Sequence, residues 1–154
     1  MANSNRLLAI KQLDRKAIEF QPLLRMQPPA KGWISLIRKS LNMTLRQLGD
    51  RLHITPQSAH EIELREANGT ISIKALSAAA EALDMKLVYG FIPQDGSLEA
   101  MIEKRARTIA TKIVSRTATS MKLEDQENSK ERLSEAIEEM TQELKRELSS
   151  KLWD

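Results

Sequence analysis

Short segments that begin at a hydroxyl residue constrain the fold of this chain more than any other feature. Thr44, Thr55 and Ser72 each precede a segment whose apolar residues follow helical spacing. Thr44 also has Gln47 three residues later, which is the pattern of a capping box. Because hydroxyl side chains cap the first turn of a helix, the pattern predicts several short helices packed together between residues 31 and 85.

Two further signals in the same region favour helices. Thr55 is followed by Pro56, and proline at the first helical position costs no hydrogen bond. Residues 32–40 form another amphipathic stretch, and we expect its core side to carry Trp33, Ile34, Ile37 and Leu41. The region is therefore predicted to be a bundle of four short helices.

The spacing of residues 45–63 is typical of a helix-turn-helix. This motif sets two helices at about 90–120° across a turn of about 3–4 residues. It requires apolar residues at fixed offsets and one small residue where the helices touch. The small position falls on Gly49, and the apolar positions fall on Leu48, Leu52, Ile54, Ala59 and Ile62.

Residues 43–55, MTLRQLGDRLHIT, resemble the lambda-repressor (Xre-type) helix-turn-helix. Two positions depart from the family pattern, since Gly49 stands where alanine is usual and His53 stands where glycine is usual. A left-handed backbone conformation is tolerable for histidine, so we expect His53 to adopt it in the turn. The resemblance implies that residues 56–65 form a recognition helix.

In this class the N-terminal part of the recognition helix contacts base edges in the major groove. Gln57 is the first candidate, because a glutamine can bond the N6 and N7 atoms of adenine together. We expect Ser58, His60 and Glu61 on the same outward face, with Glu61 able to accept from cytosine N4.

Phosphate contacts are expected from the N-terminus of the preceding helix and from the segment that follows the recognition helix. The candidates, including the helix-starting hydroxyls, are Thr44, Arg46, Thr55, Arg65, Thr70, Ser72 and Lys74. Such contacts position a protein on DNA and make binding depend on salt. Two alternatives stand beside this interpretation: the hydroxyl residues cap helices with or without DNA, and the basic residues could be ordinary solvated charges.

The rest of the chain is expected to be helical with one exception. We expect a helix at residues 5–20, a proline-rich connector, a helical stripe from Leu98 to about Arg116, and a last amphipathic helix with Leu133, Ile137, Met140, Leu144 and Leu148 on one side. Residues 86–92, KLVYGFI, predict one short β-strand.

The expected fold is mainly α, a lambda-repressor-like helix-turn-helix bundle with one short strand and helical extensions at both ends. The predicted domains are residues 1–27 (helix and linker), 28–93 (DNA-binding domain) and 94–154 (helical extension).

A lone helix-turn-helix buries too little surface to select an operator, so we expect a homodimer on a two-fold site. The predicted strand would pair with the same strand of a second chain, with Leu87, Tyr89 and Phe91 on one face. The alternative is a strand that pairs within its own chain.

Motifs along nearly the whole chain are similar to the family called mobile mystery protein A. They include residues 12–15 (QLDR), 31–34 (KGWI), 69–71 (GTI), 79–84 (AAEALD), 87–89 (LVY), 121–126 (MKLEDQ) and 152–154 (LWD). In that family the gene commonly lies beside one for a Fic-domain protein. The resemblance implies a toxin–antitoxin-like pair in which this chain is the DNA-binding, antitoxin-like member.

Two functions are therefore expected as alternatives. The first is a transcriptional regulator, a repressor, that binds double-stranded operator DNA. The second is a helical protein-binding module that neutralises a partner toxin, with DNA binding secondary. Fic inhibition is associated with a Ser/Thr-x-x-x-Glu-Gly/Asn motif, but Glu139 follows Ser134–Glu138 and Ala82 follows Ser77–Glu81, so direct active-site inhibition is not expected.

Composition argues against catalysis and metal binding. The chain has no cysteine and only two histidines, His53 and His60, so no metal site, cofactor or nucleophile–base pair is expected. No apolar run approaches the roughly 20 residues that span a bilayer, and we expect a soluble cytoplasmic protein.

The charge is distributed unevenly along the chain. Residues 97–116 carry five basic and two acidic residues, whereas residues 117–154 carry six basic and ten acidic ones. Residues 1–96 carry 13 basic and nine acidic residues, and a basic body of this kind with an acidic tail suits a polyanionic partner.

Overall fold

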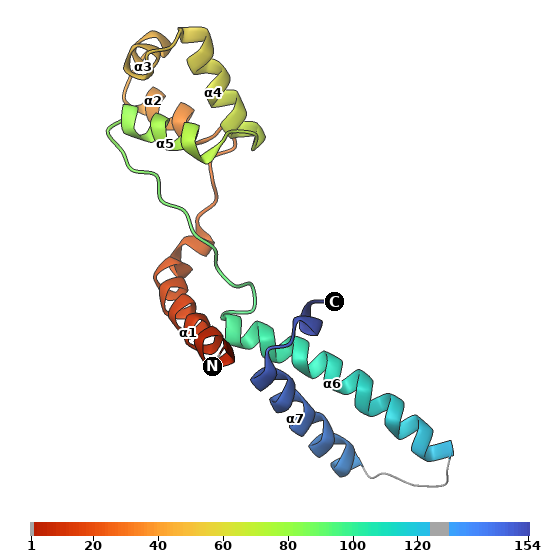
Figure 1. The fold of residues 1–154 in the computed structure, drawn as a ribbon. Helices are drawn as coiled ribbons and strands as arrows, with labels where there is room; N and C mark the ends of the chain where they lie inside the picture. The colour runs from red at the N-terminus through yellow and green to blue at the C-terminus, as the bar shows by residue number, and fades with distance from the viewer. Residues whose placement is uncertain (1, 124–129) are drawn as a thin grey trace. The chain divides into compact units, whose positions relative to one another are not determined.

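The computed structural model describes residues 2–123 and 130–154, which form seven α-helices and two 3₁₀ turns without any β-strand (Figure 1). The chain divides into two compact units. Unit 1 comprises residues 1–22 and 91–154, and unit 2 comprises residues 23–90. The expectation of a mainly helical protein is confirmed. Over the described residues, no helix is long and apolar enough to cross a bilayer.

Unit 2 is a bundle of four short helices. They are α2 (Trp33–Ser40), α3 (Leu45–Leu52), α4 (Pro56–Asn68) and α5 (Ile73–Ala82). α3 packs against both α4 and α5, and α2 packs against α4 (Figure 1). The buried core contains one side chain from each helix and one from the turn after α5: Ile34, Leu48, Ala59, Ala79 and Leu83.

The helix starts in unit 2 follow the predicted caps. The Thr44 hydroxyl accepts a hydrogen bond from the Gln47 amide at 3.1 Å, and the Gln47 side chain accepts from the Thr44 amide at 2.8 Å. Thr55 accepts from the amide of Ser58, and Ser72 accepts from that of Ala75, at 3.1 Å in each case. These bonds satisfy amides that the first turn of a helix leaves without an internal partner.

Gly49 lies where the turn between α3 and α4 comes closest to α3. A Cβ atom at this position would lie 2.7 Å from the carbonyl oxygen of Ile54. The turn itself depends on His53, which ends α3 in the left-handed conformation at φ 58°, as expected. The small residue and the left-handed residue together allow the chain to reverse direction within Leu52–Thr55.

Two sequence predictions for unit 2 and its boundary are wrong. Residues 85–93 contain no strand, so the one short β-strand predicted at residues 86–92 is absent. A strand requires a neighbouring edge for its backbone groups, and the described chain supplies none. Trp33 and Leu41 were expected on the core side of α2, yet they are 41% and 58% exposed, because the inner side of this helix is formed by Ile34, Ser35 and Arg38.

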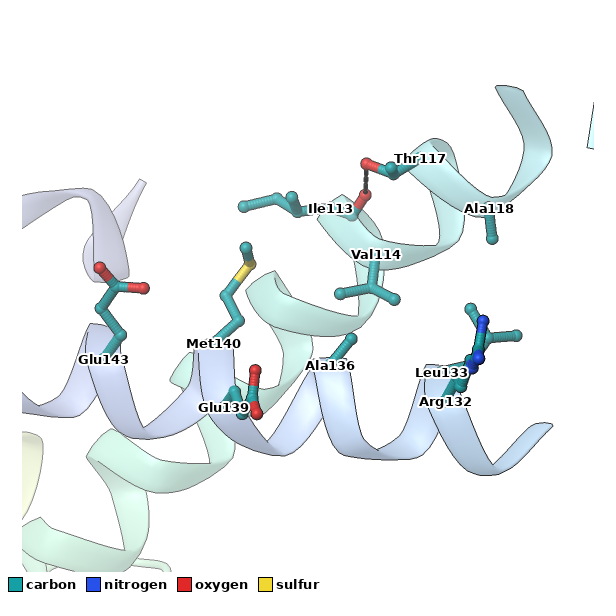
Figure 2. Close-up of a pocket in the computed structure, with 10 residues that line it drawn as sticks. All are labelled: Ile113, Val114, Thr117, Ala118, Arg132, Leu133, Ala136, Glu139, Met140 and Glu143. Atoms are coloured by element: carbon teal, nitrogen blue, oxygen red, sulfur yellow. Dashed lines mark hydrogen bonds between the residues drawn. The ribbon is translucent and has the colours of Figure 1, made fainter. Parts of the chain in front are cut away.

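Unit 1 is built on two long helices, α6 (Leu98–Leu123) and α7 (Lys130–Glu147), which pack side by side (Figure 1). The buried residues of α6 recur at every fourth position and are mostly small: Ile102, Ala106, Ala110, Val114 and Ala118. Figure 2 shows Val114 directed toward Ala136 and Met140 directed toward Ile113. Small side chains let the two helices approach closely along this side of α6.

The first and last segments of the described chain complete unit 1. α1 (Ala2–Phe20) packs against α6, and a 3₁₀ turn, η1 (Gln21–Arg25), follows it. The carboxylate of Asp14 in α1 accepts hydrogen bonds from the amides of Leu98 at 2.7 Å and Glu99 at 3.3 Å, which caps the start of α6. A second 3₁₀ turn, η2 (Ser150–Trp153), packs on α6 and buries Leu152 to 1% exposure.

Candidate nucleic-acid interface

The outward face of α4 is the best candidate for contact with a polyanion. Gln57, His60 and Glu61 are exposed there, whereas Ala59 is fully buried and Ile62 packs against the core. At about 100° per residue, the exposed positions fall on one side of the helix and the buried ones on the other. Three of the four predicted base-reading residues are thus accessible on a common face.

Ser58 differs from the other three predicted base readers. It is half-buried, its amide donates to the Thr55 hydroxyl, and that hydroxyl lies 2.9 Å from the Ser58 hydroxyl. Its polar atoms therefore belong to the helix cap. Thr55 is exposed and serves as that cap.

A buried ion pair holds α4 against α2. The guanidinium of Arg38 donates to the carboxylate of Glu63 through Nε at 2.5 Å and through Nη2 at 3.3 Å, and its Nη1 donates to the Met43 carbonyl at 2.8 Å. The side chains are only 10% and 6% exposed. Because both charges are paired and hydrogen-bonded, the pair fixes the rotation of α4, which sets the face that it presents to solvent.

A second contact anchors the C-terminal half of α4. Oε1 of Glu66 accepts from the amide of Ile34 at 2.8 Å, at the start of α2. Gly32 precedes this amide at φ 86°, and a Cβ atom there would lie 2.3 Å from Oε1 of Glu66. The absence of a side chain at position 32 therefore leaves the space that the Glu66 carboxylate occupies.

The predicted phosphate contacts from α3 lie at its exposed N-terminus. Thr44 and Arg46 are both exposed. The capping box already engages the amide of Gln47, and the amide of Leu48 donates to the Thr44 carbonyl, which leaves those of Leu45 and Arg46 for an external acceptor. Free amides at the positive end of a helix dipole, next to an arginine, suit a phosphate.

The remaining predicted phosphate contacts, in the last part of α4 and after it, are also exposed. Arg65 lies 4.0 Å from Glu61, one turn away, and its carbonyl oxygen accepts a 3.5 Å hydrogen bond from the Thr70 hydroxyl. Ser72 caps α5, and Lys74 lies exposed in its first turn. The basic side chains thus lie at the start of α3 (Arg46), in the last part of α4 (Arg65) and at the start of α5 (Lys74).

Leu64 is a residue of this face that sequence reasoning missed. It lies one turn after His60 and is 48% exposed, although it is a large apolar side chain. The signal was present in the sequence, because position 64 falls seven residues after Gln57 and outside the buried register of Ala59 and Ile62. An exposed apolar group among polar base readers could contact a thymine methyl group.

Unit 2 also carries an open apolar groove of about 770 Å³. The groove runs between α2 and α5 and is bordered by residues 23–28 and 85–88. Several of its large apolar side chains are strongly exposed, among them Leu41 at 58% and Val88 at 64%. Of the predicted dimer residues, Leu87 is half-buried and lines this groove, while Tyr89 and Phe91 are 66% and 95% exposed.

Comparison of the chain with protein-family models, with curated proteins and with solved structures finds no match. The relationship to mobile mystery protein A and to the Xre-type proteins therefore stays a prediction from the residues themselves.

Proposed function

We propose that this chain is a sequence-specific DNA-binding transcriptional regulator, a repressor, in which α3 and α4 form a lambda-repressor-like helix-turn-helix. The observation that carries the proposal is the outward face of α4, where Gln57, His60 and Glu61 are exposed while Ala59 is buried. In the proposed complex, α4 enters the major groove and Gln57 bonds an adenine. Arg46, together with the free amides of α3, would contact a phosphate.

The proposed assembly is a homodimer on a palindromic operator, since one short recognition helix reads too few base pairs. The apolar groove of unit 2 supports it, because exposed apolar surfaces of this kind commonly mark protein interfaces. The proposed occupant of the groove is a second copy of this chain. Tyr89 follows Val88 at the groove's border and would contribute without forming a strand.

A mobility-shift titration on the DNA upstream of the gene tests the first part of this proposal. Wild-type protein should bind that DNA more tightly than random duplex of equal length. Gln57→Ala should lose about 1–3 kcal/mol of preference at one base pair of each half-site. The matched control is Gln12→Ala, an exposed glutamine of α1. Equal binding of promoter and random duplex by the wild-type protein would contradict the proposal.

A second candidate function is the neutralisation of a Fic-domain partner by unit 1. The observation that favours it is an open groove of about 460 Å³ between α6 and α7, with Ile113 and Met140 on one side and Glu139 and Glu143 along its rim (Figure 2). Tight binding of the neighbouring Fic-domain protein that survives Gln57→Ala and Arg46→Ala would support this candidate. Loss of that binding on Met140→Lys would assign it to the groove.

A further inference from the structure

The face of α6 turned away from α7 carries a row of cations. Lys104, Arg105, Lys112 and Arg116, here called the basic face, are all exposed. At about 100° per residue these four positions fall within an arc of about 120°, on the side opposite Ala110 and the other residues buried against α7. Among residues 98–120, no acidic residue falls on this arc.

The two sides of α6 use their charges differently. On the side of α7, Arg107 donates to Glu138 at 2.8 Å and to Glu103 at 3.2 Å, and Lys145 donates to Glu103 at 3.4 Å. On the basic face, Lys104 donates to Asp95 at 3.1 Å. The structure gives Lys112 and Arg116 no acidic partner within the described residues. Arg105 has no carboxylate partner among the described residues either, so the unneutralised charge of the basic face lies at Arg105, Lys112 and Arg116.

A cleft of about 700 Å³ adjoins the first half of the basic face, and Lys104, Arg105 and Lys112 line it. Arg105 is held in place there, because it lies 5.1 Å above the ring of Trp153 and donates to the Leu152 carbonyl at 3.4 Å. Two acidic residues, Asp95 and Asp154, also line the cleft, whereas Arg116 lies outside it. Hence the positive charge is strongest toward the second half of α6.

We infer that the basic face binds the phosphodiester backbone of duplex DNA as a second, sequence-independent contact; the inference rests on the proposed function. From Lys104 to Arg116 the face extends about 18 Å, at about 1.5 Å per residue. Duplex DNA presents one negative charge per about 1.7 Å of its axis, so that length faces about ten phosphate charges.

The surroundings of the basic face favour DNA over a lipid surface. A helix that lies in a membrane interface needs an exposed apolar side next to its basic one. Most of the apolar side of α6, including Ala106, Ala110 and Val114, is buried against α7 instead. Among its described apolar residues only Ile113 is exposed, at 41%, in the groove between the two helices. Trp153, the exposed aromatic residue nearby, stacks with Arg105.

The test is the salt dependence of DNA binding by the full chain. Binding to the promoter duplex and to a random duplex is measured over a series of salt concentrations. Lys112→Ala/Arg116→Ala should lower the slope of log Kobs against log[salt] by about 1.8 on both duplexes, at about 0.9 per phosphate contact. Because of this smaller slope, raising the salt from 50 to 200 mM should weaken DNA binding by the variant about tenfold less than binding by the wild type. Promoter preference should be unchanged.

The matched control is Lys130→Ala/Arg146→Ala, which removes the same charge from exposed positions of α7. An unchanged slope in Lys112→Ala/Arg116→Ala, or an equal decrease in the control, would overturn the inference. Lost binding to phosphatidylserine vesicles with an unchanged DNA slope would also overturn it and assign the face to lipid. If the wild type binds both duplexes equally, the proposed function fails, while a slope difference between the two double variants still supports the basic face.

Discussion

The two units stabilise their helices in different ways. In unit 2, each of α3, α4 and α5 begins at a hydroxyl residue that caps it from the adjacent position, as Thr44 does for α3. In unit 1, α6 has a local cap as well, since the Ser97 hydroxyl accepts from the amide of Ala100 at 3.0 Å. The first two amides of α6, however, are also bonded by Asp14, which lies 84 residues earlier in the chain. Short helices gain little from their own length and need local caps, whereas long helices gain stability from their packing along one another.

Ion pairs follow the same division. Unit 2 has one buried pair, Arg38 with Glu63, which is required for the packing of α4. The pairs of unit 1, such as Arg107 with Glu138, are about half exposed. Substitution of a single charged residue should therefore lower the free energy of unfolding of unit 2 far more than that of unit 1. The unfolding of each unit can be followed separately by tryptophan fluorescence. Trp33 lies in unit 2, Trp153 lies in unit 1, and the sequence has no other tryptophan.

The largest expected effect is that of Glu63→Ala. The substitution leaves the guanidinium of Arg38 buried without its carboxylate, which should lower the free energy of unfolding of unit 2 by about 3–5 kcal/mol. Urea unfolding followed by Trp33 fluorescence in a Trp153→Phe chain measures it. The control is Glu61→Ala on the same helix, whose exposed pair with Arg65 should contribute at most about 1 kcal/mol. Equal losses of unfolding free energy in the two variants would show that the buried Arg38–Glu63 pair contributes no more to stability than the exposed Arg65–Glu61 pair.

Leu152→Ala tests whether the stability of unit 1 depends on apolar packing between its elements. Leu152 is 1% exposed and lies in the cluster with Ile102 and Ala106, so its truncation should cost about 2–5 kcal/mol. Trp153 fluorescence and helical circular dichroism in a Trp33→Phe chain follow the unfolding. Leu8→Ala is the control, because Leu8 is 56% exposed in α1 and should change stability little. In a Trp153→Phe chain, a shift in the Trp33 unfolding signal of unit 2 on Leu152→Ala would show that the two units do not depend on separate cores.

Gly49→Ala tests the close approach between α3 and the turn that follows it. Alanine favours a helix by about 1 kcal/mol over glycine. Its Cβ would lie 2.7 Å from a backbone oxygen, however, and overpacking of this kind costs about 1–3 kcal/mol. The expected net effect on unit 2 is a loss of about 1 kcal/mol, measured by Trp33 fluorescence. Gly69→Asn, at a left-handed position with open space around it, should be nearly neutral. Stabilisation by Gly49→Ala would mean that the backbone of the turn shifts to accommodate the added Cβ atom.

The smallest effect is expected from acid on unit 1. Hydrogen bonds from the Arg107 guanidinium hold the pKa of both Glu103 and Glu138 below the ordinary value of 4.5. Depressed carboxyl pKa values contribute stability that is fully present above pH 4.5 and is lost as the pH falls through the lowered values. Arg107→Gln should therefore flatten the decrease in the melting temperature of unit 1 below about pH 4.5. The control, Arg146→Gln, should leave that decrease as it is in the wild type.

Local signals explain what could be predicted from the sequence. The capping box of Thr44 and Gln47, the left-handed His53 and the outward direction of Gln57 are set by neighbours within a few residues, so spacing alone predicts them. The strand at residues 86–92 was predicted from composition, but strand formation depends on a partner edge that composition does not report.

Contacts between distant residues could not be predicted in the same way. Nothing in the spacing of Arg38 and Glu63, which lie 25 residues apart, distinguishes them from solvated charges. The same holds for Asp14 at the start of α6 and for Leu152 in the core of unit 1. Trp33 was placed in the core by its hydrophobicity, although Arg38 occupies the buried side of α2.

The cap that Asp14 provides has a consequence for the chain as it leaves the ribosome. α1 is translated before α6. Asp14 accepts a hydrogen bond from the amide of Leu98, which is translated 84 residues later. At about 5–20 residues per second, α1 waits roughly 4–17 s for α6. All of unit 2 is translated in that interval and can close its own core. During that interval α1, whose Leu8 and Leu13 are exposed even in the finished protein, has no α6 to pack against.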